Sequence, residues 1–137
     1  MYTDTDIDRI GSGLQNASLP KQEWTHAAHI AAAVWLLAHY DQAAFDLMPD
    51  MIRRYNEATG GLNSDTEGYH HTITLASLTV IQAAMGTKPR SLSEHVDELL
   101  LNGYDKPGWL LRHYSKDRLF SVHARRHWVD PDLKPLT

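Results

Sequence analysis

The chain contains no cysteine among its 137 residues. Disulfide bridges, thiolate nucleophiles, cysteine-ligated zinc and iron–sulfur clusters are therefore excluded. A bound metal ion would need histidine, carboxylate, amide, hydroxyl or water ligands. The sequence also has no G-x-S-x-G nucleophile elbow and no glycine-rich phosphate loop, because Gly60-Gly61 is not followed by Lys-Ser or Lys-Thr.

A strong excess of one charge is also absent. The formal net charge is −4 and the isoelectric point is near 6.1, so the sequence shows no overall bias toward nucleic acid or an anionic membrane. The acidic start, MYTDTDIDRIGSG, is unlike a signal or transit peptide. No segment offers about 20 truly apolar residues for a membrane span. We therefore expect a cytoplasmic protein whose partners are neither nucleic acid nor a membrane.

Two long segments, residues 24–40 and 68–87, contain no Asp, Glu, Lys or Arg. In a chain with 22% charged residues, such segments are expected in the interior. Hydrophobic periodicity is helical nearly throughout, and no convincing alternating strand is present. The sequence predicts an all-α protein, a compact single-domain bundle of five to seven helices with these two uncharged helices at its centre.

The expected boundaries follow from prolines, glycines and capping residues. A single helical domain would cover residues 1–137, with a peripheral N-terminal segment at 1–18 and an extended tail at 129–137. Leu19-Pro20 is expected to enter a helix that runs to about Tyr40. Ser64, Asp65 or Thr66 would cap the second uncharged helix, and Ser91 or Ser93 would cap the next. A last helix is expected over 117–127.

Each uncharged segment has histidine near its start. His26 and His29 are three residues apart and share one helix face with Ile30 and Ala33. His70 shares the face of the second helix that carries Ile73, Thr74, Ser77 and Ile81. The positive end of a helix dipole favours neutral imidazole, the form that ligates metal. If the helices face each other, His26, His29 and His70 would supply three nitrogens to zinc, iron or nickel.

The alternative is that these histidines are purely structural. A buried imidazole can be satisfied by hydrogen bonds within the protein, and the hydroxyl groups of Thr25, Tyr69 and Thr74 lie close in sequence. The H-x-x-H spacing also lacks the general base that H-E-x-x-H contains.

Other polar residues complete the set of candidates. Tyr55 and Asn56, late in a charged helix, would add a hydroxyl and an amide to a ligand site together with Thr25, Tyr69 and Thr74. Glu23 and Asp65 are the candidate general bases, as the carboxylates near the two histidine groups. For Asn56 and Asp65, a helix-capping role is the alternative.

Three groups of residues carry a resemblance to a known family. They are Leu19-Pro20-Lys21 with W-T-H-x-x-H at 24–29, the segment R-Y-N-E-A at 54–58 with G-Y-H-x-T-I-T at 68–74, and A-R-R through P-D-L at 124–133. These motifs resemble those of a small bacterial all-helical family of uncharacterised function. The resemblance implies a helical bacterial protein and no mechanism. It implies Glu at position 71 in many relatives, so His26 and His70 carry it best.

Two functional hypotheses follow. In the first, the protein binds a metal ion or small polar molecule through His26, His29 and His70, and any catalysis is hydrolysis in which the metal lowers the pKa of a bound water. In the second, it is a non-catalytic ligand-binding or dimerisation module. Four Trp and six Tyr suit an apolar ligand pocket or a homodimer interface. The sequence leaves open whether the protein is an enzyme.

Overall fold

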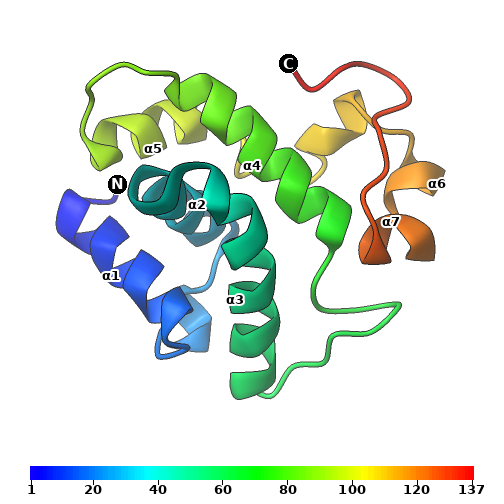
Figure 1. Cartoon of the computed structure of the whole chain (residues 1–137), viewed down its shortest axis with the longest axis horizontal. Helices are drawn as coiled ribbons and strands as arrows, with labels where there is room; N and C mark the ends of the chain where they lie inside the picture. Colours follow the sequence, from blue (N-terminus) through cyan, green and yellow to red (C-terminus); the bar gives the residue numbers. More distant parts are fainter.

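All regular secondary structure in the computed structural model, which describes residues 1–137, is helical (Figure 1). The α-helices are α1 (Asp4–Gln15), α2 (His26–Tyr40), α3 (Ala44–Ala58), α4 (His71–Met85), α5 (Leu92–Leu101), α6 (Lys116–Leu119) and α7 (Val122–Arg126). Three short 3₁₀ helices are η1 (Lys21–Glu23), η2 (Asp41–Ala43) and η3 (Trp109–Arg112). The prediction of an all-α bundle is confirmed. No helix has the length and apolar character needed to cross a membrane.

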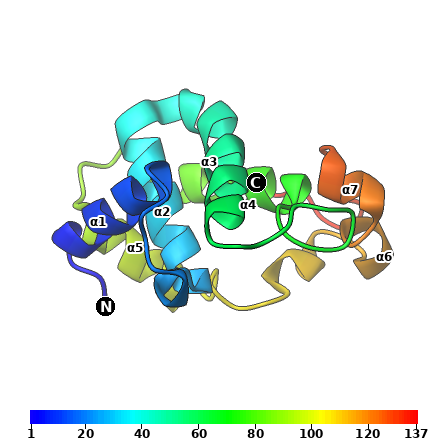
Figure 2. The same cartoon turned by 90° about the horizontal axis from the view of Figure 1, so that it is seen from below.

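Helix α2 is the centre of the bundle and packs against α1, α3, α4 and α5 (Figures 1 and 2). Nine of its 15 residues are buried. They include four consecutive small or β-branched residues, Ala31 to Val34. Small side chains let the surrounding helices approach closely, so the first uncharged segment is central, as predicted.

Helix α1 packs tightly on α2 because Gly11 lies against the Trp35 indole, where a Cβ atom would overlap the ring. The same face of α1 buries Ile7, Ile10 and Leu14 in the main core. Residues 1–18, a peripheral segment by the sequence prediction, therefore contribute side chains to the main core.

Helix α4 divides its surface between two apolar clusters. Leu78 and Ile81 belong to the main core around α2. Ala76 belongs to a smaller cluster with residues of the C-terminal segment, namely Leu110, Tyr114, Leu119, Ala124 and Val129. Figure 1 accordingly shows α6 and α7 beside the first turns of α4. The far end of α4 exposes Ala83 and Ala84, so the second uncharged helix is only partly interior.

Three boundaries differ from the prediction and one agrees. Pro20 precedes η1, and α2 begins only at His26, because the Thr25 hydroxyl accepts a hydrogen bond from the Ala28 N–H (3.2 Å). The expected helix over 117–127 is two short helices, with Ser121 capping the second. The third difference is the N-cap of α4, which is His70 and not one of the expected residues of the preceding loop. Ser91 caps α5 in a capping box with Glu94, as predicted.

Candidate functional site

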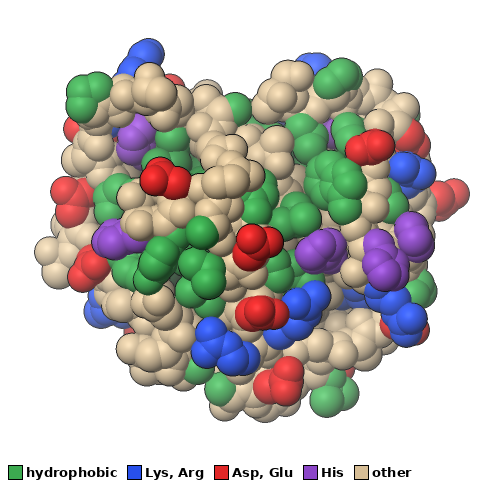
Figure 3. All heavy atoms as spheres, in the orientation of Figure 1, with side chains coloured by type: hydrophobic (Ala, Val, Ile, Leu, Met, Phe, Trp, Pro, Cys, Tyr) green, Lys and Arg blue, Asp and Glu red, His purple; other side chains and the backbone are tan.

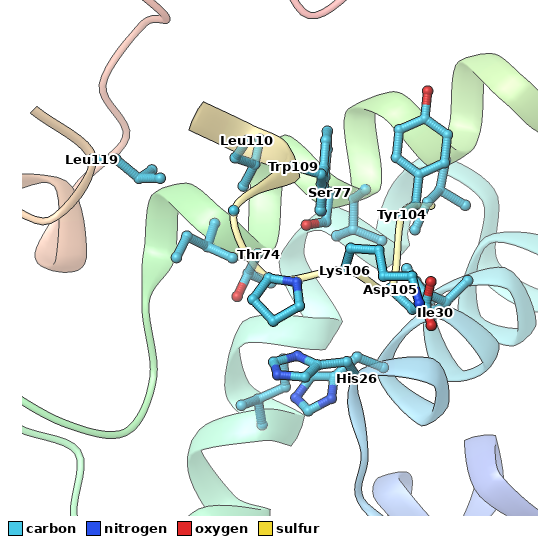
Figure 4. Close-up of a pocket in the computed structure, with 18 of the residues that line it drawn as sticks. His26, Ile30, Thr74, Ser77, Tyr104, Asp105, Lys106, Trp109, Leu110 and Leu119 are labelled. Carbon is cyan, nitrogen blue, oxygen red and sulfur yellow. The ribbon is translucent and has the colours of Figure 1, made fainter. Parts of the chain in front are cut away.

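A cavity of about 290 Å³ lies between α2, α3, α4 and the segment 104–110 (Figure 4). Twelve of its 20 lining residues are hydrophobic. Figure 4 shows His26 at one end and Trp109 and Leu110 toward the other. The apolar wall comes from these four parts of the chain and from residues 119–120 at the end of α6. Its members include Ile30, Ala33, Met48, Ile52, Ile73, Leu78, Ile81, Trp109, Leu110, Leu119 and Phe120.

Helical periodicity places the lining residues of α2 and α4 on one face of each helix. On α2, the face carries His26, His29, Ile30 and Ala33. On α4, it carries Ile73, Thr74, Ser77 and Ile81. These are the faces that the sequence predicts, and their side chains recur at three- and four-residue intervals.

The fourth wall is a turn that the sequence did not assign to the site. Gly103 and Gly108 both adopt φ of +83°, a left-handed conformation that favours glycine, and they bracket residues 104–107. The Tyr104 N–H donates to the Leu99 carbonyl (3.2 Å), and the Tyr104 ring meets Trp109 edge-on at 4.9 Å between centroids. The turn thereby brings Tyr104, Asp105 and Lys106 to the cavity. The two glycines signal a turn in the sequence, but nothing there indicates what it covers.

His29 presents a hydrogen-bond acceptor. Its Nδ1 lies 2.7 Å from the Thr25 carbonyl oxygen, which can only accept, so Nδ1 donates and Nε2 keeps its lone pair. Trp24 stacks on the ring at 3.8 Å between centroids. Burial lowers the pKa of His29 to about 4, with a smaller contribution from the charge of His26 and an opposing one from the Thr25 carbonyl. The imidazole is therefore neutral at pH 7.

His26 lies beside His29 on the same cavity wall, with 6.2 Å between ring centroids. Its side chain is exposed to solvent. Two of the three predicted metal ligands are therefore neighbours in one cavity.

His70 has a different role, because its side chain caps α4. Nδ1 accepts from the Ile73 N–H (3.1 Å), and Nε2 donates to the Leu119 carbonyl (2.8 Å). Burial lowers its pKa. The predicted caps Ser64, Asp65 and Thr66 are wrong, since the histidine itself takes this position. His70 does not line the cavity.

The residues do not form a site with three or more histidine or carboxylate ligands for one metal ion. His70 would have to give up a main-chain hydrogen bond to bind metal. Metal binding by His26, His29 and His70 stays a prediction.

Among the other predicted ligand-binding residues, Thr74 lines the cavity and its hydroxyl donates to the His70 carbonyl (2.9 Å). Thr25 supports the site indirectly, as the cap of α2 and the acceptor for His29. Tyr55, Asn56 and Tyr69 lie elsewhere. Their polar groups bond to the Leu19 carbonyl, the Asn63 amide oxygen and the His71 imidazole, respectively.

The candidate general bases do not line the cavity either. Glu23 pairs with Arg9 at 2.5 Å, and Asp65 pairs with Arg126 at 2.7 Å. Both carboxylates are thus engaged with arginine near the surface.

Asp105 is the polar residue that sequence reasoning missed. It lines the cavity, and its Oδ1 is the one buried side-chain polar atom of the molecule without a hydrogen-bond partner. Buried polar groups in proteins are nearly always paired, so an unpaired carboxylate oxygen needs an explanation.

A second concentration of histidine lies on the surface. Figure 3 shows histidine and basic side chains gathered over the start of α4 and over α7. The rings of His123 in α7 and His127 at its C-cap have centroids 5.1 Å apart. A cleft of about 260 Å³ has Arg53, Arg125 and Arg126 in its lining. Arg126 pairs with Asp65, and Arg125 donates to the carbonyls of Gly68 and Tyr69. The guanidinium groups of Arg125 and Arg126 in the cleft therefore already form hydrogen bonds or an ion pair within the protein.

Comparison with protein-family models, with curated proteins and with solved structures finds no match to this chain. The resemblance to a bacterial helical family stays a prediction, and the site has to be interpreted from its own geometry.

Proposed function

We propose that the protein binds a small, mainly apolar molecule in the cavity between α2, α3, α4 and residues 104–110. The observation that supports this most directly is the cavity itself, with its largely hydrophobic wall and few polar groups. Small-molecule sites have this composition, in which apolar surface supplies the free energy of binding and a few polar groups fix orientation.

The size of the cavity limits the ligand. Its volume of about 290 Å³ is at the lower end of ligand pockets, which span about 300–1,000 Å³. A buried apolar cavity of about 150 Å³ accommodates benzene. The natural ligand is therefore the size of a fused two-ring molecule or a short alkyl chain.

Indane, a two-ring hydrocarbon, is a suitable probe. We expect saturable binding of one molecule, followed by amide chemical shifts in NMR, with the largest changes along the cavity faces of α2 and α4. Ala33→Leu places three more carbons in the cavity and is expected to weaken binding at least tenfold. Ala83→Leu makes the same substitution on the exposed side of α4 and serves as the matched control.

The test depends on both variants being folded, which circular dichroism and thermal melting establish. The proposal would be overturned if neither indane nor an indane carrying one polar group binds the wild-type protein, or if the probe binds Ala33→Leu and Ala83→Leu equally.

A metal ion held by His26 and His29 is a second candidate, favoured by the free lone pair on His29 Nε2 beside a second imidazole. Zinc, iron or nickel would then take its remaining ligands from water or a bound molecule, and metal-assisted hydrolysis would be the chemistry available. Elemental analysis before and after chelation tests this. Near-stoichiometric metal that is lost in both His26→Ala and His29→Phe supports it, and metal-free protein after incubation with all three ions excludes it.

A further inference from the structure

We infer that the molecule bound in the cavity carries a hydrogen-bond donor, either a protonated amine that donates to both His29 Nε2 and Asp105 Oδ1 or a hydroxyl that donates to one of them. This inference rests on the proposed function and specifies the chemical class of the ligand. It depends on three features of the cavity: a fixed imidazole tautomer, an unpaired carboxylate oxygen, and the absence of a buried cation among the lining residues.

The tautomer of His29 is set by the fold. Thr25 is the cap of α2, so its carbonyl lies one turn below His29 and accepts from Nδ1 at 2.7 Å. The neutral ring then has only a lone pair at Nε2. Because burial keeps the pKa of His29 near 4, the ring offers no positive charge to an anion at neutral pH. It can only accept a hydrogen bond from a ligand.

Asp105, on the turn of residues 104–107, presents a second hydrogen-bond acceptor. Its Oδ1 is buried without a partner in the protein, and leaving a buried acceptor unpaired carries a free-energy cost. Figure 4 shows Asp105 on the turn that faces α2, next to Ile30. A donor group on the ligand would remove this cost, and an ammonium group would also neutralise the carboxylate.

The other polar groups agree with a donor and not with an anion. The Thr74 hydroxyl already donates its proton to the His70 carbonyl, so it presents lone pairs to the cavity. Lys106 is the only lysine or arginine in the lining, and it is exposed. An anionic head group would therefore meet acceptors inside the cavity.

Four probes with one carbon skeleton test the inference: indane, 2-indanol, 2-aminoindane and indane-2-carboxylate. Calorimetric or NMR titration gives each dissociation constant. We expect 2-indanol or 2-aminoindane to bind at least about fivefold more tightly than indane, since a net hydrogen bond contributes about 1 kcal/mol and one to a charged group more. We expect the carboxylate to bind most weakly. The better of the two donors identifies the ligand as an alcohol or an amine.

Two variants assign the preference to the proposed acceptors. His29→Phe keeps a ring without a lone pair, and Asp105→Asn keeps the shape without the charge. For an amine, each variant is expected to reduce the ratio of donor-probe affinity to indane affinity at least threefold. For an alcohol, the variant that removes its acceptor is expected to do so. Asp46→Asn, an exposed carboxylate outside the cavity, is the matched control and should change neither affinity.

The outcomes separate this inference from the proposed function. If indane binds as tightly as both donor probes, or if the carboxylate binds best, the donor requirement is wrong while the apolar cavity remains a binding site. If none of the four probes binds, both proposals fail.

Discussion

His70 and His29 lie in similar charge-free segments of the sequence, yet their ring nitrogens form different hydrogen bonds. Both nitrogens of His70 bond to the main chain, at Ile73 and Leu119, so the ring joins the start of α4 to the C-terminal segment. His29 uses one nitrogen for its own helix and leaves the other for the cavity. At the scale of single residues, the first is a structural group and the second is available to a ligand.

Replacing His70 by alanine should therefore lower stability. His70→Ala removes an N-cap, which is worth about 0.5–2 kcal/mol, and leaves the Leu119 carbonyl without its donor at a further cost of about 1–3 kcal/mol. We expect the free energy of unfolding in urea to fall by about 1.5–5 kcal/mol in total.

His70→Asn provides the control, because asparagine can cap α4 but cannot reach Leu119, and an intermediate loss is expected. Equal stability of His70→Ala and the wild-type protein would contradict the structural role.

At the scale of elements, the position of α2 depends on how closely α1 can approach it. The backbone of Gly11 in α1 contacts the indole ring of Trp35 in α2. The indole N–H of Trp35 donates to the Asp8 carboxylate, also in α1, at 2.9 Å. A glycine within a helix is normally unfavourable by about 1 kcal/mol relative to alanine. Here the close contact outweighs that cost.

Gly11→Ala should accordingly be destabilising, although helix propensity alone predicts a gain. The added methyl group would overlap the Trp35 ring, and overpacking of this kind costs about 1–3 kcal/mol. Thermal and urea unfolding measure the effect. Ser12→Ala, the next residue in α1, is expected to stay within about 0.5 kcal/mol of wild type, and a Gly11→Ala protein more stable than wild type would show that the helices can separate freely.

At the scale of the whole molecule, burial on several helices favours neutral imidazole. It lowers the pKa of His29 on α2, His70 and His71 at the start of α4, and His95 on α5. The unfolded chain titrates these groups near their ordinary value of about 6.5. Between that value and the lower pKa of the folded state, the unfolded protein binds more protons than the folded one.

The free energy of unfolding should therefore be highest above about pH 6.5 and should decrease as the pH falls toward 4, the region in which His29 itself titrates. His29 alone contributes on the order of 1–3 kcal/mol to this loss, reduced by its partial exposure to solvent. Urea unfolding at pH 7.5, 6.5, 5.5 and 4.5 gives the slope, and an NMR titration of the imidazole protons gives the pKa of His29. A pKa near 6.5, or constant stability over this range, would contradict the assignment.

The sequence by itself determined the class of fold, the central position of 24–40, and the helix faces that line the cavity. These depend on local properties: the absence of charge indicates burial, and the 3.6-residue period places residues three and four apart on one helix face. The Ser91 cap, set by residues three apart, was predictable for the same reason.

Only the tertiary structure decided which polar groups meet. The turn carrying Asp105 reaches α2 across more than 70 residues of sequence, and His70 bonds to Leu119 across 49. Local spacing contains no information about such contacts, because they depend on how whole helices pack. The sequence therefore predicts that His70 joins His26 and His29 in one site. In the folded chain both ring nitrogens of His70 instead form hydrogen bonds to main-chain groups, and Asp105 lines the cavity.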